Sequence, residues 1–480
     1  MRPLGPVLAF ACVFTACAPA PEVFDTGLAI TDVVVLDVTD GSRATDRTVV
    51  VQGDRIVAVE PSGSVELGQA VERVDGSGRV LIPGLWDMHA HLIGGADPDA
   101  PLKLLIANGV TGVREMWGVV EPGRELAAAI RAGDRVGPRL VVAGNLVDGV
   151  PTWWPGSSGV ATPAAGVALV DSLADAGAAF IKVYSLLEPD VYRAIVERAA
   201  ERGLPVAGHV PFSVTAREAA DAGQASMAHV FALPEGCSTA SEAVRATRVE
   251  WLAQRAAGTI VGNPYFDTGI YVRLLDGFDE ARCEALFEHL ASAGTTQVPT
   301  LSVNRSLAFA DRAEYTDDPF LDYLPQAIRQ GWAGLSAAKA ALPDSVRDIE
   351  RRFFELQVDM VRRAHAAGVP VLAGTDTPNP YVLPGFGVHR ELELLLTAGL
   401  TPLAALQAAT IGPARFFGAA DSLGTVSTGK LADLVLLEAD PLDDIRNTTR
   451  IAAVVAGGRL YDRAALDELL ASVKTAMSGG

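Results

Sequence analysis

The sequence predicts an α/β protein: a parallel (β/α)8 barrel of the TIM type, with a small β-sandwich domain formed by both chain ends. The chain has 480 residues, which allows one large barrel and a smaller unit at roughly 100–200 residues per domain. Its middle alternates short apolar segments with Ala-rich amphipathic segments, whereas both ends are rich in β-branched residues. With 49% hydrophobic and 20% charged residues, the chain can bury a large core.

The barrel is expected between residues 83 and 418, where short apolar runs are candidate strands. They are Gly84–Asp87, Gly112–Met116, Arg139–Ala143, Phe180–Tyr184, Pro205–Ala207, Ser226–Ala228, Gln297–Leu301 and Pro370–Ala373. Amphipathic segments such as Pro189–Glu201 and Ala216–Ala222 lie between them and predict helices. Strands that alternate with helices in this way indicate a parallel sheet.

The small domain is expected from residues 22–82 and 419–465, which share a β-rich pattern. The first part contains the runs Ile30–Val38, Thr48–Val51 and Ile56–Val59, separated by the turn signals Asp40-Gly41 and Gly53-Asp54. The second part contains Leu434–Leu437 and Ile451–Val455, with Gly457-Gly458 before Leu460-Tyr461. We expect residues 466–480 to be a C-terminal tail.

The charge and the cysteine content exclude several classes of protein. The chain has 39 Lys and Arg residues against 58 Asp and Glu residues, so its formal net charge is 39 − 58 = −19. Because an acidic chain of this size repels phosphate backbones, no nucleic-acid partner is expected. Four Cys are too few for a disulfide scaffold. After export Cys237 and Cys283 could pair, but sequence cannot give their distance, and two small buried thiols are the favoured interpretation.

The N-terminal segment 1–17 is interpreted as a lipoprotein signal peptide. Arg2 precedes an apolar stretch that is shorter than the about 20 residues of a membrane span and suits a secretory signal. Phe14-Thr15-Ala16-Cys17 resembles a bacterial lipoprotein box, and the alternative is a buried N-terminal helix. We expect lipid on Cys17 as the only membrane contact and a location on the periplasmic side. Ala18, rather than Asp, favours the outer membrane by resemblance to sorting rules.

Four of the seven histidines fall where predicted barrel strands end. His89 and His91 have the spacing that puts both side chains on one side of a strand. His209 and His229 end the two predicted strands that follow Lys182, and Asp376 follows the last one. Because the carboxyl ends of barrel strands share one face, these residues predict a site for divalent metal, with zinc expected from imidazole and carboxylate ligands.

Lys182 lies inside the apolar strand Phe180–Tyr184, where an ammonium is costly unless it is compensated or chemically altered. One interpretation is an inward lysine paired with a carboxylate such as Asp376 or Glu115. The other is a lysine that takes part in the metal site.

Three segments of the chain resemble motifs of the amidohydrolase superfamily. Residues 83–91 read Pro-Gly-Leu-Trp-Asp-Met-His-Ala-His and are similar to its opening motif. Residues 429–437 are similar to the return into the small domain, and residues 391–410 to the segment after the last barrel strand. The resemblance covers about residues 28–465 and is to the branch of imidazolonepropionase-like enzymes and metal-dependent, prolidase-like dipeptidases. Met116-Trp117-Gly118 departs from the branch's Asp-containing end of the second strand.

The resemblance implies the roles of the site residues. By it, Lys182 is a carboxylated lysine that bridges two divalent ions, of which His89, His91 and Asp376 hold one and His209 and His229 the other. An ammonium cannot bridge cations, whereas the carbamate formed with CO₂ carries a negative charge and two oxygens. Asp376 would also move the proton from the metal-activated hydroxide to the leaving nitrogen.

Other candidates lie around this set, each with two interpretations. Tyr184 faces the same way as Lys182 and either hydrogen-bonds a tetrahedral oxyanion or fills the barrel. Trp153 and Trp154 either line the site or pack on its rim. His289 and His365 fall in helical patterns and are expected to be solvated or packed. His389 either orients the substrate or the ligands, or has a capping or packing role.

The expected function is cleavage of a C–N bond in a small molecule, dipeptide or N-acyl amino acid by a metal-activated hydroxide. The alternative is a metal-dependent lactone, ester or phosphoester hydrolase, because metal ligands do not identify the leaving group. A non-enzymatic, lipid-anchored binding protein is the third hypothesis. The sequence leaves open whether one or two ions bind and whether the chain forms a homo-oligomer.

Overall fold

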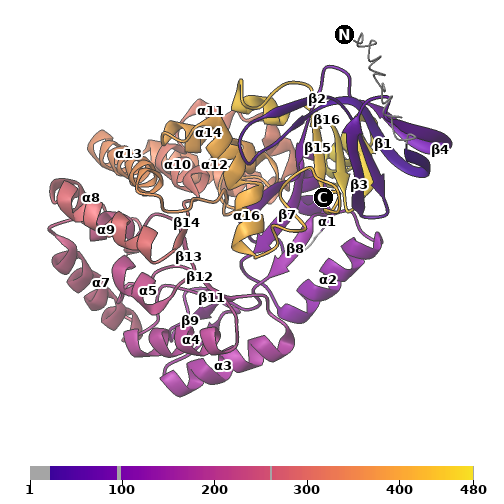
Figure 1. Cartoon of the computed structure of the whole chain (residues 1–480). Helices are drawn as coiled ribbons and strands as arrows, with labels where there is room; N and C mark the ends of the chain where they lie inside the picture. Colours follow the sequence, from indigo (N-terminus) through magenta and orange to yellow (C-terminus); the bar gives the residue numbers. More distant parts are fainter. Residues whose placement is uncertain (1–21, 94–98, 260–261, 479–480) are drawn as a thin grey trace, which may run out of the picture.

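A computed structural model describes residues 22–93, 99–259 and 262–478. It has a mainly β part built from both ends of the described chain and a larger part in which helices surround short strands (Figure 1). The predicted α/β class is therefore confirmed. The predicted signal peptide, residues 1–17, lies outside the described residues.

Both chain ends contribute to one eight-stranded sheet of order β17-β16-β15-β5-β1-β2-β3, with β4 paired to β1. The strands are β1 (Glu22–Leu36), β2 (Arg43–Gln52), β3 (Arg55–Pro61), β4 (Val65–Asp75), β5 (Val80–Pro83), β15 (Leu434–Leu437), β16 (Ile451–Ala456) and β17 (Arg459–Asp462). The two ends join where β5 pairs antiparallel with β15, in the register Ile82↔Val435. The structure thus contains the predicted sheet domain, while its division into two facing layers remains a prediction.

The segment that we expected as a tail, 466–480, is helical as far as Ser478. It belongs to α17 (Arg463–Ser478), which packs on α1 (Asp99–Ala107) through Leu470 and the buried Val473. Leu466, Leu470 and Val473 recur at the i, i+4, i+7 spacing of one helix face. The helix signal was therefore present in the sequence.

The larger part contains two parallel sheets. One has the order β6-β7-β8, and the other has the order β10-β9-β11-β12-β13-β14. The strands are β6 (Leu85–Ala90), β7 (Val110–Glu115), β8 (Arg139–Val142), β9 (Val147–Asp148), β10 (Ser158–Gly159), β11 (Ile181–Val183), β12 (Val206–Gly208), β13 (Ser226–Ala228) and β14 (Thr296–Val298). All pairings within them are parallel, as the alternation of strands and helices predicted.

The last predicted strand, Pro370–Ala373, is not a regular strand. Among the described residues, its one β-bridge is the isolated parallel bridge between Gln297 and Val371. Pro370 has no N–H to donate, so a regular ladder is interrupted there. The segment still lies between β14 and β6, because Leu372 N donates to Gln297 O (2.9 Å) and Met88 N donates to Ala373 O (2.9 Å).

Helices connect the parallel strands and cover them (Figure 1). Besides α1 and α17, the described helices are α2 (Val120–Ala132), α3 (Pro163–Ala176), α4 (Pro189–Glu201), α5 (Ala216–Ala222), α6 (Leu233–Gly236), α7 (Ser241–Ala256), α8 (Thr268–Asp276), α9 (Glu280–Ser292), α10 (Leu301–Phe309), α11 (Ala313–Thr316), η1 (Pro319–Tyr323), α12 (Gln326–Ala340), α13 (Asp344–Ala366), α14 (Phe386–Thr397), α15 (Pro402–Ala408), α16 (Ile411–Phe416) and η2 (Ile445–Thr449). The predicted bounds of α5 match because the sequence marks both of its ends: Thr215 and Glu218 form a capping box, and Gly223 ends the helix at φ +94°.

Cys237 and Cys283 form a disulfide. The favoured prediction of two separate thiols was therefore wrong. Cys237 ends α6 and Cys283 lies in the first turns of α9, and both side chains are fully buried beside Met360. Forty-six positions separate the two residues in the chain, so their proximity depends on how α6 and α9 pack.

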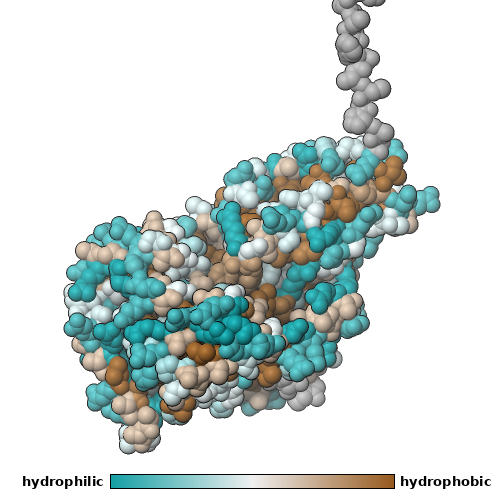
Figure 2. Space-filling view, turned by 60° about the horizontal axis from the view of Figure 1, so that its bottom comes forward, coloured by the Kyte–Doolittle hydropathy of each residue, from teal (hydrophilic) through white to brown (hydrophobic). Residues whose placement is uncertain are grey.

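The surface seen in Figure 2 is mostly hydrophilic, and its apolar residues gather in smaller areas. Among the described residues, no helix combines the length and the apolar character that crossing a bilayer requires.

Candidate active site

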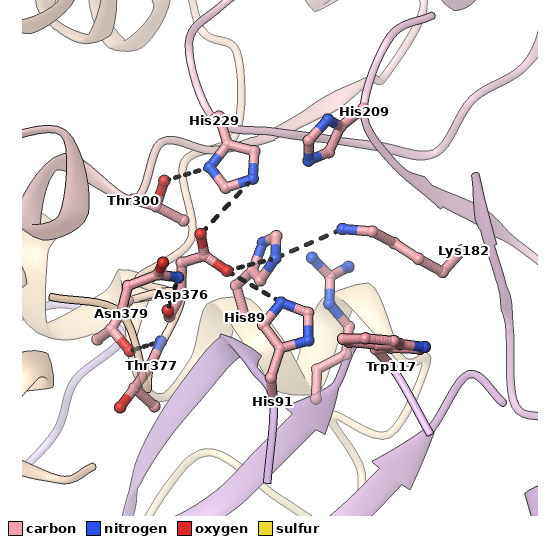
Figure 3. A network of polar contacts seen from close by, with 12 residues as sticks. His89, His91, Trp117, Lys182, His209, His229, Thr300, Asp376, Thr377 and Asn379 are labelled. Atoms are coloured by element: carbon pink, nitrogen blue, oxygen red, sulfur yellow. Dashed lines mark hydrogen bonds and ion pairs between the residues drawn. The ribbon is translucent and has the colours of Figure 1, made fainter. Parts of the chain in front are cut away.

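The predicted metal ligands converge from separate strand ends (Figure 3). His89 lies in β6 and His91 directly after it, His209 follows β12, His229 follows β13, and Asp376 lies in the segment between β14 and β6. The rings of His89 and His229 are 4.8 Å apart between centroids, and those of His209 and His229 are 4.7 Å apart. The structure therefore brings together residues that are up to 287 positions apart in the chain (376 − 89 = 287).

His89, His91 and Asp376 form the tightest part of the cluster. Asp376 Oδ1 is 2.9 Å from His91 Nε2 and 3.3 Å from His89 Nε2. One ligand atom from each residue lies within 4.8 Å of the others. Within the part of the chain that the structure describes, the buried Nδ1 atoms of both histidines have no hydrogen-bond partner. Two imidazoles and a carboxylate in this arrangement fit a divalent cation such as zinc.

The rings of His209 and His229 are held by hydroxyl groups. His209 Nδ1 is 2.8 Å from both Ser185 Oγ and Tyr265 OH, and His229 Nδ1 is 2.7 Å from Thr300 Oγ1. These contacts leave the Nε2 atoms as candidate ligand atoms, and His229 Nε2 lies 4.0 Å from Asp376 Oδ2. Fixing one ring nitrogen of a ligand histidine is how neighbouring groups orient it toward a metal.

Lys182 is fully buried in β11, with Nζ 3.4 Å from His89 Nε2. Burial lowers the pKa of its amine to about 7, against the opposing effect of Asp376. Near neutral pH much of the amine is therefore uncharged, and this is the form that can react with CO₂. Glu115, one of the predicted partners, instead accepts hydrogen bonds from the backbone N–H groups of Leu92 (2.7 Å) and Trp117 (3.2 Å).

Three residues of the site have a strained backbone conformation. His229 (φ +61°), Asp376 (φ +65°) and Thr300 (φ +49°) lie in the left-handed region that side chains other than glycine seldom adopt. Such conformations cost on the order of 1–3 kcal/mol each and cluster at functional sites. Hydrogen bonds hold two of them, from His229 N to Val298 O (2.8 Å) and from Asp376 N to His89 O (2.7 Å).

Two glycines allow the strand ends to approach one another. A Cβ at Gly374 would lie 2.5 Å from Val298 Cγ1 and 2.9 Å from His89 N. Gly208, at φ +131°, would place a Cβ 2.2 Å from the carbonyl oxygen of Val183. Larger residues at these positions would force the ligand strands apart.

The electrostatic environment favours the protonation states that bind metals. Burial, together with neighbouring cations, lowers the pKa of His89 and His209 well below the usual value and that of His229 to about 4. Burial opposes ionisation of Asp376, but His229, His91 and Lys182 together lower its pKa. Neutral imidazoles and an ionised carboxylate are the forms that coordinate a cation.

The comparisons with known proteins agree with this geometry. The profile of the Amidohydrolase family matches residues 80–461, which include every residue of the cluster. The chain belongs to the amidohydrolase family. It is therefore a hydrolase by family. No protein of curated function matches the chain in sequence.

Several solved structures resemble this amidohydrolase. Bottromycin amidohydrolase is 24% identical, with a TM-score of 0.71, 94% of this chain covered and 90% of the other. A prolidase complexed with N-methylphosphonate-L-proline is 19% identical, with a TM-score of 0.64 and coverage of 91% and 99%. The ochratoxinase of A. niger is 21% identical, with a TM-score of 0.62 and coverage of 92% and 96%. At these identities the likeness shows the shared fold.

Asp87 is a buried residue of the amidohydrolase site that the sequence analysis missed. Its Oδ1 accepts hydrogen bonds from the backbone N–H groups of His89 and Thr375 (both 3.0 Å), and its Oδ2 accepts one from Thr375 Oγ1 (2.6 Å). It thereby ties the strand of His89 to the segment of Asp376. Burial raises the pKa of this carboxyl to about 7. The only available signal was its position two residues before His89 in the motif.

Tyr184 follows β11 and lies against His209, with the ring centroids 3.9 Å apart. Its hydroxyl accepts a hydrogen bond from Trp154 Nε1 (2.9 Å). Burial raises the pKa of Tyr184 well above the usual value, so its hydroxyl stays protonated and can donate a hydrogen bond.

The remaining histidines lie outside the cluster. His389 is buried, with Nδ1 2.9 Å from Thr448 Oγ1 and Nε2 3.1 Å from the carbonyl oxygen of Asn108. Its role is structural, as the packing interpretation expected. His289 pairs with Asp221 (2.6 Å) on the surface and His365 is exposed, in agreement with the expectation for both.

Proposed function

We propose that this amidohydrolase is metal-dependent and hydrolyses a C–N bond, amide or peptide, in a small molecule, dipeptide or N-acyl amino acid. The observation that carries the proposal is the cluster in which the ligand atoms of His89, His91 and Asp376 lie within 4.8 Å of one another. The Nε2 atom of His229 lies beside the same carboxylate. The amide-cleaving names of the similar structures agree with it.

We further propose that the two parallel sheets form one (β/α)8 barrel, with the segment 370–377 as the eighth element. Isolated parallel bridges connect this segment to β14 at Gln297 and to β6 at Ala90. On the other side, Ala179 N donates to Val142 O (2.9 Å) and connects β8 to the segment that leads into β11. A barrel would put all the ligands at the carboxyl ends of its strands, where such enzymes place their chemistry.

In this proposal His89, His91 and Asp376 would hold one ion, His209 and His229 would hold a second, and Lys182, as a carbamate, would be a ligand of both. Zinc suits this donor set. Bound divalent ions would supply an activated water and polarise the scissile carbonyl. The position of Lys182 supports this role, because its buried amine lies 3.4 Å from His89 Nε2 and, in addition to burial, its charge lowers the pKa of both His209 and His229.

Two side chains of the site would act at the scissile bond, one by proton transfer and the other by hydrogen bonding. Asp376 would take a proton at its carboxylate and deliver it to the leaving nitrogen. Tyr184 would donate a hydrogen bond from its hydroxyl to the oxygen that gains negative charge, since that hydroxyl accepts from Trp154 and keeps its own hydrogen for a second partner.

A substrate panel tests the proposed bond class. After reconstitution with Zn²⁺ and bicarbonate, we expect the protein to hydrolyse members of a library of dipeptides and N-acyl amino acids. Matched lactones, esters and phosphoesters without activating groups should be poorer substrates. Selective lactone or phosphoester hydrolysis would replace the C–N assignment by the alternative bond class. A metal-loaded protein that is inert toward every substrate would favour a binding protein.

We also propose that the protein is exported, carries lipid on Cys17 and is anchored in the outer membrane from the periplasmic side. The lipoprotein box that ends at Cys17 supports this location. In a Gram-negative host we expect the parent protein in the outer-membrane fraction and the variant Cys17→Ser in the soluble or inner-membrane fraction. Identical fractionation of the two would contradict the lipid anchor.

A further inference from the structure

Two tryptophans from different loops stand beside the site. Trp117 follows β7, and its ring lies 6.3 Å from that of His91 between centroids. Trp154, in the loop between β9 and β10, lies 6.5 Å from Trp117 and donates its indole N–H to Tyr184 OH. Tyr184 in turn packs on His209. Contacts between aromatic side chains therefore connect His91 to His209, two of the predicted ligands. Figure 3 shows Trp117 beside His91 at this edge of the cluster.

The loop that carries Trp154 is anchored. Its neighbour Trp153 stacks on Trp251 at 5.4 Å with 25° between the ring planes, and the guanidinium of Arg255 covers both rings. Arg255 also donates to the carbonyl oxygen of Thr152 (2.8 Å). Asp148 accepts a hydrogen bond from the backbone N–H of Trp153 (2.9 Å). Each of the two predicted interpretations therefore fits one of these tryptophans. Trp153 packs on the rim, and Trp154 remains available to the site.

Trp154 keeps 45% of its surface exposed, whereas its neighbours Trp117 and Tyr184 are half-buried. Val119 and Val150, in the same two loops, are 56% and 60% exposed. Anchored aromatic and apolar surface beside a polar cluster is what a binding site for an apolar group offers, because covering that surface releases water from it.

We propose that Trp117 and Trp154 form a subsite for an aromatic group next to the scissile bond, so that the substrates are amides with an aromatic side chain or acyl group. This inference rests on the proposed function for the identity of the reaction, but the binding of the aromatic group does not. An aromatic ring that packs against tryptophan gains interaction energy beyond the area it buries. An aliphatic group of similar size lacks that part of the gain.

Binding of a matched pair of ligands, 3-phenylpropanoate and 3-cyclohexylpropanoate, separates the subsite from the reaction. Both ligands have the same carboxylate, so contributions from metal or lysine cancel in their ratio. By calorimetric titration of the zinc-loaded protein, we expect the phenyl ligand to bind about 3- to 10-fold more tightly, in line with the energy of aromatic pairs. In Trp117→Ala and in Trp154→Ala, the ratio of the two affinities should fall toward the value expected from the buried apolar area of each ligand alone.

Two further variants give the test its controls. Trp154→Phe keeps a ring and loses the N–H that contacts Tyr184, so it should retain most of the binding ratio. Val249→Ala, at an exposed apolar position of α7, should match the parent, and thermal unfolding should show that all variants fold. Equal binding of the two ligands by the parent, or an unchanged ratio in both alanine variants, would overturn the subsite. If the parent binds the phenyl ligand preferentially but hydrolyses no amide, the proposed function fails and the subsite stands.

Discussion

Lys182→Ala is expected to lose most of the hydrolase activity. The lysine is fully buried beside His89, and in the proposed centre its carbamate is the bridge between two ions. Loss of groups that merely orient metal ligands typically costs about 10- to 100-fold, so loss of a bridge should cost at least about 100-fold in kcat/KM. Acetate or propionate should restore part of the activity by supplying a carboxylate in the space that the side chain leaves.

The measurement for Lys182→Ala is kcat/KM on the best amide substrate, with and without added short carboxylates, beside the metal content of each sample. Lys474→Ala changes a lysine of α17 whose side chain is 44% exposed, and it should behave like the parent. Full activity of Lys182→Ala would remove the bridge and leave a site with one ion built on His89, His91, His209, His229 or Asp376.

Asp376→Asn is expected to reduce amide hydrolysis much more than hydrolysis of an activated ester. A nitrogen leaving group must be protonated to depart, whereas the leaving group of an activated ester needs this far less. General acid–base groups contribute about 10²- to 10⁴-fold, which sets the size of the expected gap. Asparagine has nearly the same shape and tolerates positive φ, so the backbone at φ +65° is expected to be retained.

The alternative role of Asp376 is that of a ligand and nothing more. In that case the rates on both substrates would fall together and in step with the metal content of the variant. Measuring both rates and the metal occupancy of the same Asp376→Asn sample distinguishes the two roles. Equal losses at reduced occupancy would contradict the proton transfer.

Local sequence signals predicted much of the fold. The bounds of α4, α5 and β15 match because a proline, a capping box or a continuous apolar run marks them. The segment Pro370–Ala373 did not form the predicted regular strand, because Pro370 has no N–H to donate to a ladder. Helix α17 occupies most of the segment predicted as a C-terminal tail, and Leu466, Leu470 and Val473 have the spacing of one helix face.

The residues of the cluster could be predicted because histidines at the ends of the predicted strands are rare and regularly placed. The residues that hold them could not be found in the same way. Tyr265 contacts His209 from 56 positions away, and Thr300 contacts His229 from 71 positions away. A single hydroxyl in a loop carries no local pattern, so only the packed structure identifies it. The pairing of Cys237 with Cys283 depends on packing in the same way.

Elemental analysis of the mature, purified protein, joined to an amide hydrolysis assay of the same sample, tests the metal-dependent reaction most directly. After reconstitution with zinc and bicarbonate we expect up to two zinc ions per chain. We also expect activity that a chelator removes and zinc restores. Amide hydrolysis at full rate by protein that contains no transition metal, before and after chelation, would contradict the proposed centre.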